Sequence, residues 1–187
     1  MGSHRCFRIC YYYTKDNPIF ESPSENYLRD SINLFFGGSM GELEEQIRLF
    51  YKAILNTEDL PFPYNNFPHG CCQDASWILH RYLFEKGYTS IDLVGGEYHG
   101  DNGEFMSHVW LELDGTIIDI TYSQFIDEVS DVVITENRNL HQKFIENYRY
   151  RKPYWETYTD GHTSDLLDHF YNNVIENVNV TRQNYEP

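Results

Sequence analysis

Residues 69–76 read HGCCQDAS, and the pattern of a helix begins inside this stretch. From Cys72 to Lys86, apolar side chains recur every three or four residues, as they do along the buried face of a helix. They are Ala75, Ile78, Leu79, Tyr82 and Leu83. Gly87 follows the last turn, where a residue in the left-handed conformation commonly ends a helix. The stretch therefore places Cys72 at the start of a helix with one buried face.

An antiparallel hairpin is predicted downstream of this helix. Two strand-like segments, about 104–113 and 116–121, flank Asp114-Gly115, and Asp-Gly between alternating apolar residues is the strongest short signal of a two-residue turn. Alternation gives one apolar face, expected to be core: Val109, Leu111, Leu113, Thr116, Ile118 and Ile120. The other face carries His108, Trp110, Glu112, Ile117, Asp119 and Thr121.

The register of this hairpin brings a histidine and an aspartate together. If Leu113 lies opposite Thr116, then His108 and Asp119 are diagonal neighbours on one face. Their Cα atoms are expected to be roughly 7–8 Å apart. An imidazole and a carboxylate can bridge that separation, so the sequence predicts a hydrogen-bonded pair.

Cys72, His108 and Asp119 are the residue types that thiol chemistry requires. A thiol is a nucleophile only when it is ionised, and both a helix start and a nearby imidazolium favour the thiolate. Asp119 would orient the His108 ring, and the Cys72 backbone N–H would donate to an oxyanion. The sequence leaves the second oxyanion donor open among Asn65, Asn66 and Tyr64. These residues predict attack of a thiolate on an acyl carbon.

Three segments resemble the transglutaminase-like superfamily of cysteine enzymes with a papain-like fold. Gly70-Cys71-Cys72-Gln73-Asp74 resembles its Gly-x-Cys-x-Asp opening, and His108-Val109-Trp110-Leu111-Glu112 resembles its His-x-Trp-x-Glu strand. Asp119-Ile120-Thr121 is similar to its Asp-Pro-Thr strand end, with isoleucine in place of proline. The resemblance covers about residues 67–122. It implies that Cys72, rather than Cys71, is the nucleophile.

The resemblance also implies a fold and an activity. The fold is α+β, with an antiparallel sheet packed on the helix that starts at Cys72 and extra helices at both ends. By this match His108 is the base, Asp119 orients it, and no cofactor is needed. Apart from the resemblance, Trp110 is expected to form a wall of the cleft or to fill the core. We expect acyl transfer on a carboxamide or peptide bond of a peptide or protein substrate, with hydrolysis ahead of amine transfer. The alternative is a non-catalytic module that binds a peptide or protein partner.

A length of 187 residues suits a single domain with three parts. Residues 1–60 form a helical N-terminal part, residues 61–135 the core, and residues 136–187 a helical C-terminal extension. The helices expected outside the core lie at about Ser24–Phe36, Met40–Asn56, Asn139–Tyr148 and Thr163–Asn177. Within the core we expect further strands at Ile91–Val94 and Val129–Thr135, and a glycine-rich loop, Gly95–Gly103, at the edge of the cleft.

The composition disfavours several classes of protein. The formal net charge of −15 repels phosphate backbones, so nucleic-acid binding is not expected. The basic residues Arg149, Arg151 and Lys152 are expected to pair with the acidic surface. The cysteines lack CxxC spacing and the histidines lack His-x-x-x-His spacing, so neither a disulfide framework nor a metal site is expected. Without an apolar run of membrane-span length or a signal-peptide pattern, we expect a cytoplasmic protein.

Overall fold

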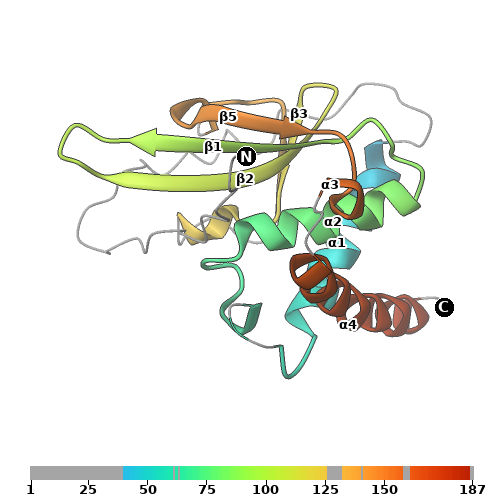
Figure 1. Ribbon diagram of the computed structural model, residues 1–187. Coiled ribbons are helices and arrows are strands. Elements are labelled where there is room, and N and C mark those ends of the chain that lie inside the picture. Colours follow the sequence, from blue (N-terminus) through green and yellow to red (C-terminus); the bar gives the residue numbers. More distant parts are fainter. Residues whose placement is uncertain are drawn as a thin grey trace.

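The computed structural model describes residues 40–60, 62, 64–125, 132–139, 141–157 and 161–185. In this part of the chain, one antiparallel sheet carries helices on one of its faces (Figure 1). The α+β class and the antiparallel sheet expected from the sequence are therefore confirmed. The helix expected at about Ser24–Phe36 lies outside the described residues.

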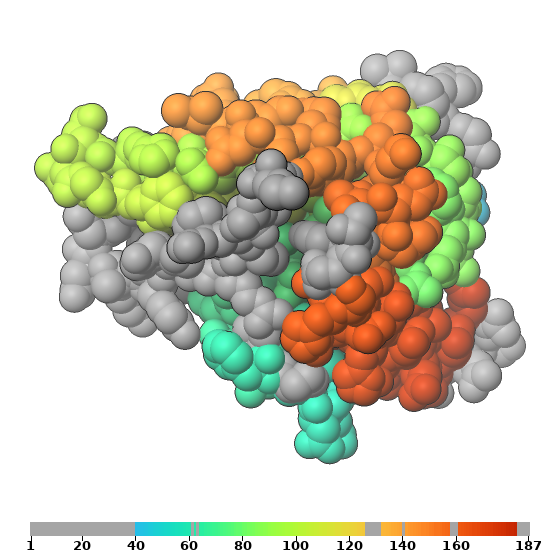
Figure 2. Space-filling view, viewed as in Figure 1, coloured from blue at the N-terminus to red at the C-terminus, as the bar shows by residue number. Residues whose placement is uncertain are grey.

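The sheet has five strands in the order β4-β3-β2-β1-β5. The strands are β1 (Asp92–His99), β2 (Phe105–Leu113), β3 (Thr116–Asp119), β4 (Val133–Thr135) and β5 (Ile145–Tyr150). The hairpin formed by β1 and β2 projects at one end of the sheet, away from the end where the C-terminal helix lies (Figures 1 and 2).

The α-helices are α1 (Met40–Leu55), α2 (Cys72–Glu85), α3 (Tyr154–Thr157) and α4 (Gly161–Tyr185). Short 3-10 turns are η2 (Tyr64–Asn66), η3 (Tyr122–Gln124) and η4 (His141–Lys143). Helix α2 packs against β1 and β2, and both α1 and α4 pack against α2. The predicted helices from Met40 and from Cys72 are confirmed. The predicted helix from Thr163 is also present and extends further in both directions.

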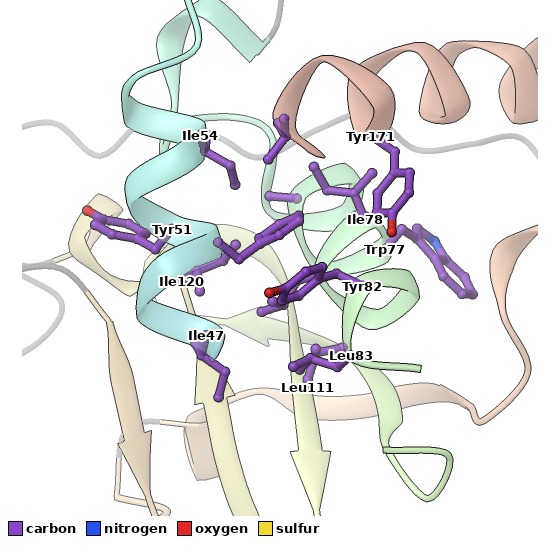
Figure 3. Packing of buried hydrophobic residues seen from close by; sticks show 14 of the residues in the cluster. Ile47, Tyr51, Ile54, Trp77, Ile78, Tyr82, Leu83, Leu111, Ile120 and Tyr171 are labelled. Carbon is purple, nitrogen blue, oxygen red and sulfur yellow. The ribbon is translucent and has the colours of Figure 1, made fainter. Parts of the chain in front are cut away.

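The core is divided between the two faces of the sheet. On the helix-bearing face, the apolar stripes of α1 and α2 meet Leu111 of β2 and Ile120, which directly follows β3 (Figure 3). On the opposite face lies a smaller apolar cluster, which contains Val94, Met106, Trp110, Ile117, Tyr122, Phe125, Val133 and Phe144. Both faces of the hairpin are therefore buried, including the face that carries His108, Trp110 and Asp119.

The hairpin register predicted from Asp114-Gly115 is correct. Leu113 pairs with Thr116, and the next pairs outward follow the same register. Asp114 and Gly115 have φ values of 49° and 92°. Two consecutive residues with positive φ are what a type I′ turn requires, and this turn matches the twist of the strands.

The prediction of a loop at Gly95–Gly103 is wrong for its first half, because β1 continues to His99. A Cβ atom on Gly95 would lie 2.1 Å from the ring of Tyr148. One on Gly96 would lie 2.9 Å from the Cβ atom of Phe144. These glycines are therefore strand residues that leave room for aromatic side chains, rather than turn residues.

The prediction of a helix at Asn139–Tyr148 is also wrong, and with it the description of residues 136–187 as wholly helical. This segment forms η4 and then β5, which pairs antiparallel with β1 at the edge of the sheet. Tyr148 and Tyr150 lie on the same face of β5, two residues apart, and their rings stack with centroids 5.2 Å apart. This two-residue period is typical of a strand.

The basic residues around β5 pair with acidic groups, as predicted. Arg149 contacts Glu146 and Glu112, Arg151 contacts Asp92 at 2.8 Å, and Lys152 lies 3.8 Å from Glu156. The contacts of Arg149 with Glu112 and of Arg151 with Asp92 join β5 and the residue that follows it to β2 and β1. Among the described residues, the helices are all too short or too polar to cross a lipid bilayer.

Candidate active site

His108 and Asp119 form the hydrogen-bonded pair that the sequence predicts. The Nε2 atom of His108 donates to Oδ2 of Asp119 at 2.6 Å, and both side chains are buried. His108 lies in β2, and Asp119 is the last residue of β3. Because adjacent antiparallel strands hold both residues, the pair is fixed by the backbone of the sheet.

Asp119 accepts further hydrogen bonds that the sequence analysis did not anticipate. Its Oδ1 atom accepts from the backbone N–H of Thr121 at 2.9 Å and from the Thr121 hydroxyl at 3.1 Å. Its Oδ2 atom also accepts from Nε2 of His141 at 2.9 Å. Burial alone would raise the pKa of Asp119. The charge and hydrogen bond of His108, together with the hydrogen bond of His141, outweigh burial and hold that pKa well below its ordinary value.

Aromatic rings enclose the His108 imidazole on the face away from the helices. Trp110 stacks beside it with ring centroids 5.8 Å apart, and Phe125 meets it edge-on at 4.8 Å. The side-chain amide of Gln124 donates to Nδ1 of His108 at 3.3 Å. His108 therefore has a polar contact at each ring nitrogen and apolar walls elsewhere.

Trp110 is held in place through its own N–H group. Its Nε1 atom donates to Oε1 of Glu112 at 3.0 Å, and Glu112 in turn accepts from Arg138 at 2.8 Å and from Arg149 at 3.0 Å. Burial would raise the pKa of Glu112, but these donors and charges lower it overall. Trp110 thus packs beside the His108 ring, and its N–H is already engaged by Glu112.

Cys72 is the first residue of α2, as predicted, and Cys71 is the residue that precedes the helix. Both cysteines are buried, and neither forms a disulfide. About one turn further along α2, the hydroxyl of Ser76 donates to the backbone carbonyl of Val109 at 3.0 Å. This bond anchors the first turns of α2 to the strand position next to His108.

The structure thus brings two of the three predicted catalytic residues into direct contact. Cys72 packs in the cluster on the helix-bearing face of the sheet, together with Val109 and Ile120. The His108 ring contacts aromatic residues of the cluster on the other face.

The candidates for the second oxyanion donor lie in η2, on the segment before α2. Tyr64 is buried and its ring stacks on Phe170 of α4, with centroids 3.9 Å apart. Asn65 and Asn66 are exposed, and Asn65 lines a cavity of about 420 Å³ together with Leu60 and Tyr64. Tyr64 is therefore part of the helical core. Asn65 and Asn66 remain predicted candidates for the second oxyanion donor.

The side chains of His108, Asp119 and His141 have the composition of a metal site, with ligand atoms within 4.8 Å of one another. A tetrahedral zinc ion bound at about 2.0–2.2 Å holds its ligand atoms about 3.3 Å apart. The N–O distances of 2.6 and 2.9 Å are shorter than this and match hydrogen bonds instead. In addition, Nδ1 of His141 has no partner among the described residues, whereas a metal-bound histidine normally donates from that atom.

His141 and Gln124 are the site residues that the sequence analysis missed. His141 follows Asp119 by 22 residues and lies in a segment predicted to be helical. Gln124 follows His108 by 16 residues and lies in η3. No motif or spacing links either residue to the hairpin. The position of Gln124 depends on the turn after β3, and that of His141 on the path of the chain after β4.

Comparison with protein-family models, with curated proteins and with solved structures found no match to this chain.

Proposed function

We propose that this chain is a cysteine-dependent acyl-transfer enzyme with a transglutaminase-like, papain-like fold. It would act on a carboxamide or peptide bond through a thioester on Cys72. The observation that carries the proposal is the buried hydrogen bond of 2.6 Å between His108 and Asp119. Burying an ionised carboxylate is costly unless it is paired, and orienting a catalytic imidazole is a frequent use of such a pair. Nδ1 is then the ring nitrogen through which His108 exchanges a proton.

In the proposed reaction, the Cys72 proton passes to Nδ1 of His108 and the thiolate attacks the carbonyl carbon. As the tetrahedral intermediate collapses, the imidazolium gives this proton to the nitrogen that leaves as an amine or as ammonia. The acyl group remains on Cys72 as a thioester. Water then attacks with His108 as the base, the carbon–sulfur bond breaks, and the proton returns to the thiolate as the carboxylic acid departs.

The proposal requires the Cys72 thiol to meet Nδ1 of His108 in the reacting conformation. Support comes from the hydrogen bond between Ser76 and Val109, which holds the first turns of α2 beside the strand that carries His108. The Gln124 amide now donates to Nδ1. It has to rotate, or present its oxygen, when the imidazole becomes protonated.

Mass spectrometry of an acyl adduct tests the chemistry. The wild-type chain is incubated with a peptide that contains glutamine and asparagine, and with an activated acyl ester as a second donor. We expect an adduct on Cys72, its loss in Cys72→Ser, and its retention in Cys71→Ser, which is the matched control. An adduct confined to Cys71 would reassign the nucleophile. No adduct with either donor would count against the enzyme.

An engineered disulfide tests the spatial requirement independently of any substrate. A disulfide joins residues whose Cβ atoms lie about 3.5–4.5 Å apart. We expect His108→Cys to form a disulfide with Cys72 under mild oxidation, and the variant Cys72→Ala/His108→Cys to form none. If the disulfide involves Cys71 instead, the thiol that reaches position 108 is not Cys72, and the assignment of the nucleophile is wrong.

A non-catalytic binding module is the second candidate. Cys72 and His108 are each only 1% exposed, and they contact different apolar clusters. In such a module the histidine–aspartate pair would only stabilise the sheet. Labelling with iodoacetamide at neutral pH separates the two candidates. An enzyme labels at Cys72 at least as fast as a free thiol, whereas a buried structural thiol labels fast only after unfolding.

A further inference from the structure

A second histidine shares the aspartate of the proposed catalytic pair. His141 lies in η4 and donates from Nε2 to Oδ2 of Asp119 at 2.9 Å, the same oxygen that accepts from His108 at 2.6 Å. Its side chain is 2% exposed. The proposed triad of Cys72, His108 and Asp119 does not require a second buried imidazole at this oxygen.

We infer that His141 is a positioning residue, which holds Asp119 and limits how strongly that carboxylate favours a charged His108. The inference rests on the proposed function, because it assigns a role within that site.

The hydrogen bonds around His141 define its protonation state. An ionised carboxylate only accepts, so Nε2 of His141 carries the proton in this bond. Its Nδ1 atom is buried and has no partner among the described residues. A protonated His141 would place an unpaired N–H donor there, at a cost of about 1–3 kcal/mol. The geometry therefore fits a neutral His141 that donates from Nε2.

The carboxylate of Asp119 is fully occupied as a result. It accepts four hydrogen bonds, two at Oδ2 from His108 and His141 and two at Oδ1 from Thr121. Four is about the number that a carboxylate can accept, so neither oxygen is left to rotate toward another donor. Removing His141 would leave one acceptor position on Oδ2 empty. The carboxylate would then interact more strongly with His108 and would be less firmly oriented.

The other charged and titratable groups near this site do not perform this task. The Tyr122 ring lies 5.7 Å from His141, and burial, followed by the charge of Asp119, raises the pKa of its phenol, which therefore stays neutral. Glu112 lies behind Trp110 and is neutralised by Arg138 and Arg149. Asp119 and His141 are therefore the polar groups that set the charge of His108 at Nε2.

The test compares His141→Phe with His141→Gln. Phenylalanine keeps a ring but removes the donor, whereas glutamine can place an N–H group near the position of Nε2. For His141→Phe we expect the low-pH limb of the activity profile, where His108 takes up a proton and can no longer act as the base, to move up by about 0.5–1 pH unit. We also expect kcat to fall about 10-fold or more with little change in KM, because orientation is lost rather than substrate binding. His141→Gln should restore most of both values, and His169→Gln in α4 serves as the exposed control.

A second measurement does not depend on activity. In a Cys72→Ala background, the ring resonances of His108 are titrated by NMR with and without His141→Phe, after circular dichroism has confirmed folding. We expect His108 to titrate at higher pH when His141 is absent. Equal titrations, or equal losses of kcat in the Phe and Gln variants, would overturn the inference and leave a purely structural histidine. If the NMR shift is present but wild-type thiol chemistry is absent, the proposed function fails while the role of His141 toward His108 stands.

Discussion

The ring of Tyr148 occupies the space in which a Cβ atom on Gly95 would lie, at a distance of 2.1 Å. Gly95 is in β1 and Tyr148 is in β5, and the two residues are paired across the strands. This contact explains how a glycine-rich segment can be a strand. It also shows how the edge strand β5 is held against the sheet.

The variant Gly95→Ala is expected to destabilise the fold by about 1–3 kcal/mol, because the added methyl group overlaps the tyrosine ring. Denaturant unfolding measures the change. Gly161→Ala is the matched control, since nothing lies within 4 Å of a Cβ atom there, and it should change stability by less than about 0.5 kcal/mol. Combining Gly95→Ala with Tyr148→Ala should cost less than the sum of the single changes; simple additivity would mean that the overlap is relieved elsewhere.

Asp119→Asn tests the orientation of His108. The amide keeps the shape of the side chain but loses the charge. It has a single oxygen, so it cannot accept all the hydrogen bonds that Asp119 accepts from His108, His141 and Thr121. We expect the rate of acyl transfer to Cys72 to fall by about 10²–10⁴-fold, measured with an activated ester. Asp165→Asn, on the exposed side of α4, should leave the rate unchanged. A rate within a factor of two of wild type would remove Asp119 from the mechanism.

His80 is expected to make stability depend on pH. Its Nε2 atom lies 3.1 Å from the Ile91 carbonyl, its Nδ1 atom is buried without a partner among the described residues, and burial lowers the pKa of the ring. The unfolded chain therefore binds a proton in a pH range where the folded chain does not. The stabilisation is complete above about pH 6.5 and decreases as the pH falls from there toward the lowered pKa of the folded state.

The variant His80→Gln keeps an N–H donor for the Ile91 carbonyl but cannot take up a proton. Between pH 8 and pH 5, wild type should lose more stability than this variant, by at most about 1.4 kcal/mol per pH unit in the titrating range. Unfolding in urea at each pH measures the difference. His162→Gln, at an exposed position of α4, should follow wild type. Parallel curves for wild type and His80→Gln would show that His80 titrates alike in both states.

Arg81 is expected to anchor α4 to the rest of the fold. Its Nη1 atom donates to Asp168 and to the Tyr154 hydroxyl, each at 2.6 Å, and its guanidinium lies 3.9 Å from the centroid of the Tyr171 ring. Arg81→Met removes these contacts and should destabilise the chain by about 1–3 kcal/mol. The stability of Arg81→Lys should lie between that of wild type and that of Arg81→Met, because an ammonium group keeps the charge but cannot form the planar contacts.

Hydrogen exchange locates this effect. In Arg81→Met the amides of α4 should exchange faster than those of α2, because α4 loses its attachment at this point. Arg48→Met is the control, since the exposed pair with Glu44 in α1 contributes only about 0.2–0.5 kcal/mol. Uniformly faster exchange across the chain would point to global destabilisation instead.

Local signals in the sequence were sufficient for the parts of the site that are close together along the chain. The Asp114-Gly115 turn defines the hairpin register, and that register alone brings His108 to Asp119. The apolar period of three and four residues defines the helix that starts at Cys72. In both cases the geometry follows from backbone conformations that neighbouring residues determine among themselves.

Only the tertiary structure decided the remaining features. Gly95 is a strand residue because Tyr148, far along the chain, fills its side of the sheet, and residues 145–150 are a strand because β1 offers an open edge. His141 reaches Asp119 only after the chain has passed β4, and Cys72 belongs to a different apolar cluster from the rings around His108. These outcomes depend on contacts between distant segments. A local stretch of sequence cannot predict these contacts, because each one needs a partner residue from another part of the fold.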